Sequence, residues 1–251
     1  MLIAAAVCPG APLLVPELAT ERSDALAELR RRCRQALDQV SASRPDSITV
    51  VGSGPRTATF GAEAVGSLAP YGPADRIRLT GERADTGVAV LPLSLSLGAW
   101  LLAEVGWHGR VRGLSVAESS SSGDCVSLGC QYAREPGRVA LLVIADGSAR
   151  RSRQAPGYWD RRAAGFDEAV AAALAAVDRT ALLRVDPELA RDLLAAGRAP
   201  LQVLAGAATD GDWRADLLWH EAPYGVGYFV ATWRRPTVGN GDPGLPNPAD
   251  R

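Results

Sequence analysis

The sequence predicts an α/β protein, a three-layer α/β/α sandwich around a mixed, mostly parallel central sheet. Three observations predict this class. Short apolar segments alternate with amphipathic helical segments along most of the chain. The run Val139–Ile144 holds six consecutive apolar residues, as expected of a central strand covered on both faces. Two further apolar runs close the chain and favour an antiparallel hairpin.

The length and composition bound the domain organisation. The chain has 251 residues, of which 47% are hydrophobic and 22% are charged. Such a chain can bury a full core, and we expect residues 1–235 to form one domain. Residues 236–251 are rich in Pro, Gly and Asn, which predicts a disordered tail.

The charge pattern argues against two classes of partner. The formal net charge is −1 and the basic residues are scattered, so the sequence shows no nucleic-acid footprint and no polybasic membrane anchor. The apolar stretches are shorter than the ~18 residues of a spanning helix. The first residues lack the charged region of a signal peptide. We expect a cytoplasmic protein that binds a small molecule or a protein partner, and neither nucleic acid nor a membrane.

The reactive side chains that the sequence contains exclude several kinds of catalytic and metal site. The four cysteines have unrelated spacings, which favours reduced thiols over disulfides. Every basic residue is Arg, which excludes a Schiff-base lysine and a P-loop lysine. His108 and His220 are the only histidines, so one chain cannot supply a three-histidine site.

The first half of the chain starts with a predicted strand at residues 2–7, broken by Pro9 and Gly10. A helix is predicted at residues 20–40. Its core positions recur every three or four residues: Leu26, Leu29, Cys33, Leu37 and Val40. Residues 47–51 predict a second strand that ends in a glycine-rich turn through Ser53. Such a turn could bind phosphate, but no phosphate-binding motif is completed here, which favours a plain tight turn.

The middle of the chain is less regular. Residues 56–90 predict a short helix and a loop around Asp85 and Thr86. Residues 90–97 have strand character and residues 98–105 predict a short helix. Residues 111–116 predict a strand, followed by a polar lead at 118–124 into a helix that runs through Tyr132.

The second half carries the central strand and the closing hairpin. Asp146, Gly147 and Ser148 supply turn chemistry after Ile144, and a helix is predicted at residues 167–177. Further helices are predicted at 186–195 and 201–208. Residues 215–219 and 228–233 predict the antiparallel hairpin. Ligands of open α/β sheets gather at the carboxyl ends of the strands, so the loop after Ile144 is where we expect a site.

Four stretches together resemble the class III extradiol ring-cleavage dioxygenases, the LigB-type superfamily that includes Memo-like proteins. They are residues 9–17 (PGAPLLVPE), 52–55 (GSGP), 145–167, which begin ADGSAR, and 221–228 (EAPYGVGY). The stretches look like that family's first-strand loop, second-strand loop, Gly-Asp-x-Ser-His loop and C-terminal signature. Their order and spacing imply the family fold over roughly residues 2–233.

The resemblance implies an Fe(II) enzyme, but its histidines are replaced here. The family holds iron with two histidines and a glutamate, and uses another histidine as acid or base. These histidines fall on Gly10, on or beside Ser53, on Thr86 and on Ala149, whereas Glu221 retains the acidic position. One carboxylate with neutral hydroxyls is a poor ligand set for Fe(II). A rebuilt site of Glu221 with Cys8 or His220 is the remaining metal alternative.

The resemblance also implies a pocket. Its expected lining residues are Gly10, Ser53, Asp85, Thr86, Ala149, Arg150, Glu221 and Tyr224. Asp146 and Ser148 are the candidate catalytic residues, although both residue types also cap turns. Arg150 would grip an anionic ligand or lie in a solvated loop.

Three functions are consistent with these residues. The first is a divergent extradiol dioxygenase-like protein without the Fe(II) site, with no cofactor, that binds a small aromatic or anionic molecule. The second is an active iron-dependent dioxygenase whose ligands are atypical or come from a second subunit. The third is a non-catalytic interaction or scaffold protein, for which the apolar closing hairpin would support a homo-oligomer.

Overall fold

The computed structural model describes residues 1–19, 23–72, 76–83, 88, 90–208 and 211–236. Within this part of the chain, the main sheet has seven strands in the order β3-β6-β2-β7-β1-β9-β8. Their bounds are β1 Leu2–Cys8, β2 Ser47–Gly54, β3 Ala58–Phe60, β6 Arg110–Ala117, β7 Val139–Ile144, β8 Arg214–Glu221 and β9 Tyr228–Arg234. Strands β4 (Val65–Ser67) and β5 (Arg76–Arg78) form a separate antiparallel pair.

The main sheet is mixed, as predicted. Strands β6, β2, β7 and β1 are parallel, whereas β3, β9 and β8 join antiparallel at the two edges. The prediction that Val139–Ile144 is a central strand is confirmed, because β7 is buried along its whole length between β2 and β1. The closing hairpin is confirmed as β8 and β9.

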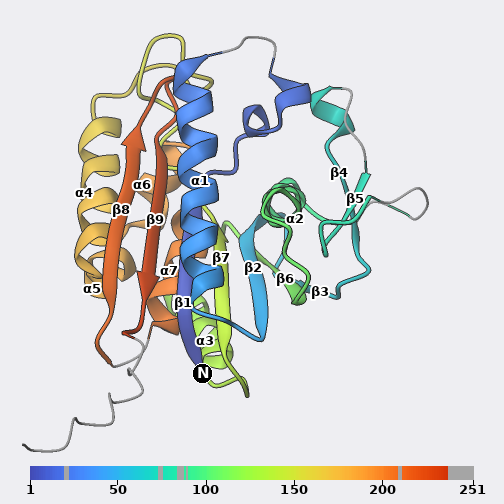
Figure 1. The fold of residues 1–251 in the computed structure, drawn as a ribbon. Coiled ribbons are helices and arrows are strands. Elements are labelled where there is room, and N and C mark those ends of the chain that lie inside the picture. Colours follow the sequence, from blue (N-terminus) through green and yellow to red (C-terminus); the bar gives the residue numbers. More distant parts are fainter. Residues whose placement is uncertain (20–22, 73–75, 84–87, 89, 209–210, 237–251) are drawn as a thin grey trace, which may run out of the picture.

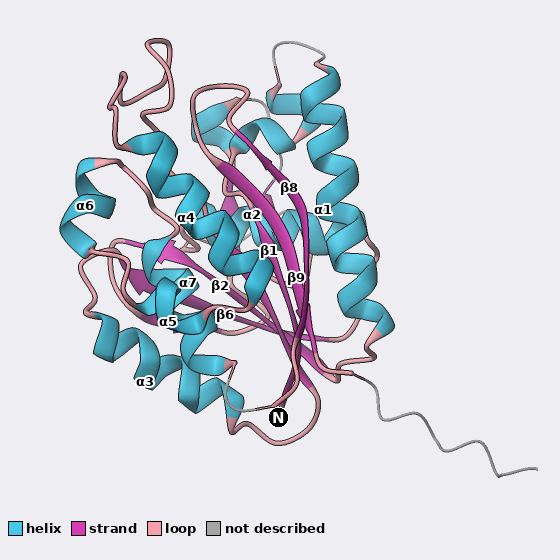
Figure 2. Ribbon diagram, turned by 90° about the vertical axis from the view of Figure 1, so that its left-hand side faces the viewer, coloured by secondary structure: helices cyan, strands magenta, loops and turns pink. Residues whose placement is uncertain are grey.

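Helices cover both faces of the sheet and complete the predicted sandwich (Figures 1 and 2). Helices α1 (Asp24–Ala42) and α2 (Leu93–Glu104) pack on one face. The other face carries α3 (Ser122–Ala133), α4 (Ala163–Ala176), α5 (Arg179–Leu183) and α7 (Arg198–Ala207). The short α6 (Pro187–Asp192) and the 3₁₀ turns Pro12–Leu14, Pro16–Leu18 and Ala69–Tyr71 complete the elements.

Alternation along the strands divides the core into two layers. Along β7, Leu141 and Val143 face the α3/α7 layer, while Leu142 and Ile144 face the α1/α2 layer. The predicted core positions of α1 are all buried, which confirms the apolar stripe of that helix. Burial of such a stripe is the main source of stability for an amphipathic helix.

One predicted strand is wrong. Residues 90–97 were expected to be extended, but residues 93–97 form the start of α2. The alternating Leu and Ser residues imitate a half-buried strand. Both serines are buried in the structure. Their hydroxyls tolerate burial because Ser94 Oγ donates to the Ser53 carbonyl (2.6 Å) and Ser96 Oγ donates to the Pro92 carbonyl (3.1 Å). Residues on all sides of this helix are therefore either apolar or hydrogen-bonded serines. For this reason the sequence lacks the apolar periodicity that marks a surface helix.

Several other helices and strands begin or end at residues that differ from the predicted ones. Instead of the short helix expected within residues 56–90, the described part of that segment has a single 3₁₀ turn and the three short strands β3, β4 and β5. Helix α4 starts four residues before the predicted start at Asp167, and α5 was not predicted. The predicted tail lies outside the described residues from 237 onward.

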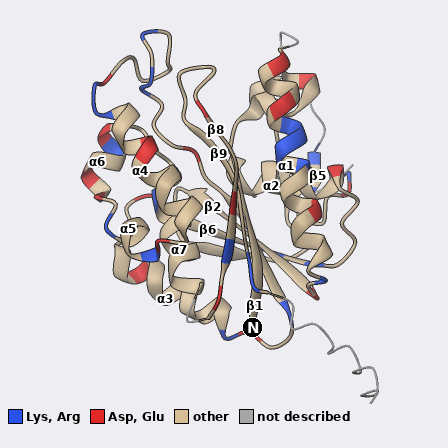
Figure 3. Ribbon diagram, turned by 60° about the vertical axis from the view of Figure 1, so that its left-hand side comes forward, with Lys and Arg blue, Asp and Glu red and all other residues tan. Residues whose placement is uncertain are grey.

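The surface agrees with the scattered charge of the sequence. Acidic and basic residues are interspersed over the helices and loops of both layers (Figure 3). No helix among the described residues combines the length and apolar character needed to cross a membrane.

Candidate functional site

A cleft of about 890 Å³ opens at the carboxyl ends of the parallel strands. The strand ends contribute Gly10, Ser53 and Asp146 to its lining. The start of α2, residues 118–119 after β6, and residues 187–199 of α6 and α7 supply the other walls. This is the position at which α/β sheets commonly bind ligands.

Asp146 lies in the cleft as a partly buried carboxyl group. It lies two residues after the end of β7, and the Gly10 backbone N–H donates to its Oδ1 at 2.9 Å. Its Oδ2 makes no hydrogen bond within the described residues. Burial raises the pKa of Asp146 to about 6, with the nearby Asp167 contributing in the same direction. Asp146 can therefore exchange a proton near neutral pH, as a general acid or base must.

The N-terminus of α7 is held against the backbone of Asp146. The Gly197 N–H donates to the Asp146 carbonyl at 2.9 Å. A Cβ on Gly197 would lie 2.4 Å from that carbonyl oxygen, so only glycine allows this approach. The contact places Arg198 and Ala199 in the cleft wall.

Asp167 is the second carboxylate near the loop after β7, and it is fully buried. It accepts from the Ser148 N–H (2.7 Å) and from Arg151 Nη1 (2.8 Å). A Cβ on Gly227 would lie 2.1 Å from its Oδ2. Burial raises the pKa of Asp167, although the Ser148 N–H and Arg151 act against this rise. These hydrogen bonds of the Asp167 carboxylate connect α4 to the loop after β7. Asp167 does not line the cleft.

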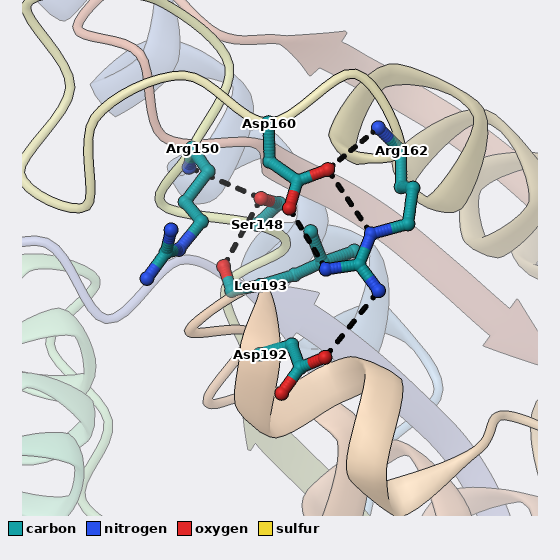
Figure 4. A network of polar contacts seen from close by, with 6 residues as sticks. All are labelled: Ser148, Arg150, Asp160, Arg162, Asp192 and Leu193. Atoms are coloured by element: carbon teal, nitrogen blue, oxygen red, sulfur yellow. Dashed lines mark hydrogen bonds and ion pairs between the residues drawn. The ribbon is translucent and has the colours of Figure 1, made fainter.

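Ser148 is placed as a capping residue. Its hydroxyl is fully buried, donates to the Leu193 carbonyl (3.1 Å) and accepts from the Arg150 N–H (3.1 Å), as Figure 4 shows. The same view shows Arg162 between Asp160 and Asp192, with the Arg150 guanidinium pointing away from them. These contacts fix the loop after β7, and the Ser148 hydroxyl is not exposed to the cleft.

The structure brings together part of the predicted pocket. Gly10, Ser53 and Asp146 converge on the cleft although they are far apart in sequence. Ala149 and Arg150 lie in the following loop and do not line the cleft. Asp85 and Thr86 lie outside the described residues.

Glu221 and Tyr224 also lie outside the cleft lining. Glu221 is exposed at the end of the edge strand β8, and Tyr224 packs at the edge of the α1/α2 layer core. Glu221 is two strands away from Asp146, because Tyr228 of β9 pairs with both residues. Arg150 makes no ion pair with Glu221 in the described part of the chain.

The donor set does not fit the Fe(II) site that the resemblance implies. Gly10 and Ala149 have no ligand atom, and Glu221 lies outside the cleft lining. Cys8 is buried towards α1, whereas His220 stacks on Phe229 of the opposite core layer (5.2 Å between ring centroids). Among the described residues, no three His, Cys, Asp or Glu side chains are arranged to hold a metal ion.

Sequence reasoning missed the cleft wall formed by α6 and α7. Arg191, Ala196, Arg198 and Ala199 belong to no recognisable motif. No local signal pointed to this wall, because the helix was predicted to begin at residue 201, three residues after Arg198, where the structure starts α7.

No protein-family model and no curated protein matches the chain. Its fold is similar to that of a solved structure, the crystal structure of uncharacterized protein JW3007 from Escherichia coli K12. The two chains are 16% identical, with a TM-score of 0.54 over 92% of this chain and 99% of the other. At this identity the similarity establishes the fold alone.

Proposed function

We propose that this protein is a divergent extradiol dioxygenase-like protein that binds a small organic molecule in the cleft and does so without the family's Fe(II) site. The observation that carries the proposal is the cleft at the carboxyl ends of the strands, where Gly10, Ser53 and Asp146 meet. Two of these three positions are those at which the resemblance places ligand histidines.

The lining suits a small molecule with an apolar part and a few polar groups. Leu93, Ile144 and Ala195 offer apolar surface, whereas Asp146 and Ser119 offer polar atoms. Pockets of several hundred Å³ with this mixture are typical of small-molecule sites. Catechol is a suitable neutral probe, because the resemblance implies aromatic ligands.

Binding tests the pocket directly. We expect calorimetry to detect catechol binding to protein that has been treated with chelator. Ser53→Phe should abolish binding by filling the cleft, and Ser53→Ala is the matched control that should retain it. Equal binding by the wild type and Ser53→Phe would contradict this location of the pocket.

Metal analysis tests the second part of the proposal. We expect purified protein to contain no stoichiometric Fe or Zn, and oxygen uptake with catechol to stay at background when Fe(II) is added. Stoichiometric metal that is lost on Glu221→Gln would contradict the proposal. Oxygen uptake with Fe(II), alone or with cell lysate as a source of a second subunit, would favour the active dioxygenase instead.

A further inference from the structure

We propose that the cleft binds a small organic cation, a primary amine, whose ammonium group pairs with the carboxylate of Asp146. This inference rests on the proposed function, because it concerns the same cleft and names the class of molecule that the cleft takes. Four features of the cleft support this ligand class.

The first feature is a partly buried carboxylate with few partners. The Gly10 N–H donates to Asp146 Oδ1 at 2.9 Å, and within the described residues Oδ2 accepts no hydrogen bond. Neither oxygen forms an ion pair in the part of the chain that the structure describes. An ionised carboxylate can accept about four hydrogen bonds, and carboxylates withdrawn from water are normally paired. A cationic donor on a ligand would supply the missing partner.

The second feature is that the cations of the cleft wall have acceptors of their own. Arg198 lines the cleft, but its guanidinium donates to two backbone carbonyls of the loop after β6. Arg191 also lines the cleft, and its Nη2 lies 3.8 Å from Glu188 Oε1. These two groups therefore do not act as counter-ions of Asp146, and the place of a cation beside its carboxylate is left to a ligand.

The third feature is the sign of the potential at Asp146. The nearby Asp167 carboxylate adds by repulsion to the effect of burial, which together raise the pKa of Asp146 to about 6. Asp146 is therefore mostly ionised above pH 7. A cation bound beside it would reduce the repulsion between the two carboxylates, whereas an anion would increase it.

The fourth feature is the mixture of groups around the carboxylate. A Cβ on Gly10 would lie 3.1 Å from Asp146 Oδ2 and 3.2 Å from Ile144 Cγ2, so the carboxylate and an apolar side chain both lie beside this glycine. All three residues line the cleft, as do Ser53 and Ser119, whose hydroxyls can accept from an ammonium group. This arrangement suits an amine with an apolar body.

A metal ion is a less suitable cation for this place. Among the described residues, no three His, Cys, Asp or Glu side chains are arranged to hold a metal ion. An ammonium group needs only one carboxylate and neutral acceptors, which the cleft offers at Asp146 and at its serines.

Calorimetry at pH 8 and low salt should compare benzylamine with benzyl alcohol, its neutral analogue of similar shape, and with benzoate. We expect benzylamine to bind at least about tenfold more tightly than benzyl alcohol, because its hydrogen bond to Asp146 is charge-assisted. Benzoate should bind more weakly than either. Ser53→Phe should abolish benzylamine binding by filling the cleft.

Two variants locate the carboxylate that pairs with the amine. Asp146→Asn removes the charge and keeps an acceptor for the Gly10 N–H, and it should weaken benzylamine binding about tenfold and benzyl alcohol binding by no more than about twofold. Glu118→Gln is the matched control, because Glu118 also lines the cleft but is exposed. It should leave benzylamine binding within about twofold. Urea unfolding at pH 8 checks that both variants are folded.

Equal affinity of the wild type for benzylamine and benzyl alcohol would overturn the inference without the use of any variant. Tighter binding of benzoate, benzylamine binding that persists in Ser53→Phe, or a loss of affinity in Glu118→Gln and not in Asp146→Asn would also overturn it. Catechol binding that is lost in Ser53→Phe would still support the proposed function in each of these cases, so the two failures are distinguishable.

Discussion

Asp146 and Asp167 lie beside the same loop, but their carboxylates have different surroundings. Asp167 is fully buried and satisfied by the Ser148 N–H and by Arg151. Within the described residues, Asp146 has one hydrogen bond, from Gly10, and it lines the cleft. The comparison separates a structural carboxylate from one that is available to a ligand. Completed hydrogen bonding marks the first, and incomplete bonding in a cleft marks the second.

The largest expected effect is on the structural carboxylate. Asp167→Ala should lower the free energy of unfolding by about 3 kcal/mol or more, because it leaves the Arg151 guanidinium and a buried N–H unpaired. Urea denaturation measures this change. Asp216→Ala is the matched control, since its ion pair with Arg234 is partly exposed and should contribute about 1 kcal/mol or less. Similar losses in both variants would contradict a structural role for Asp167.

The second-largest expected effect is the dependence of the free energy of unfolding on pH, through the ionisation of Asp146. The folded-state pKa of about 6 exceeds the ordinary value of 3.8, so the folded protein binds a proton more tightly than the unfolded chain. The stabilising contribution of the protonated carboxyl is present at low pH and is lost as pH rises from about 4 through 6. The loss is at most about 3 kcal/mol, because Asp146 is partly exposed.

Asp146→Asn should remove this pH dependence while keeping the acceptor for the Gly10 N–H. Urea unfolding of both proteins between pH 4 and pH 8 measures the difference. Parallel stability profiles for the wild type and Asp146→Asn would show that burial does not shift this group.

A smaller effect distinguishes the two readings of Ser148. Ser148→Ala should cost about 1–2 kcal/mol, because the Arg150 N–H loses its acceptor and the Leu193 carbonyl keeps only the Ala149 N–H as a donor. Catechol affinity should not change, since Ser148 does not line the cleft. A large loss of affinity with unchanged stability would make Ser148 a ligand-binding residue.

The smallest effect is expected at Glu221. Glu221→Gln should change the unfolding free energy by no more than about 0.5 kcal/mol, because the side chain is exposed and lies outside the cleft. Ligand affinity should also stay unchanged. A tenfold loss of catechol affinity would restore Glu221 to the site and favour the arrangement of the resembled family.

Local patterns were sufficient to predict much of the fold. The apolar run of β7, the stripe of α1 and the closing hairpin follow from burial of one or both faces of an element. Helix α2 was not predictable in this way, because Ser94 and Ser96 satisfy their hydroxyls on nearby carbonyls. A buried serine of this kind looks like an exposed position in the sequence.

The site was predictable only where a motif ends a strand. Gly10, Ser53 and Asp146 each follow or end a parallel strand, and such ends meet at one edge of a sheet. The wall at Arg198 depends on the Gly197 contact with Asp146, between residues 51 positions apart. No local pattern encodes that contact. Glu221 lies outside the cleft lining, because the strand that carries Tyr228 separates it from Asp146.

The most direct test of the site is to map a bound ligand by NMR. We expect titration with catechol to shift the backbone amides of Gly10, Ser119 and Ala199, which line the cleft, and to leave His220 and Glu221 of β8 unchanged. Shifts confined to β8, or the absence of saturable shifts, would contradict a ligand site at the carboxyl ends of the parallel strands.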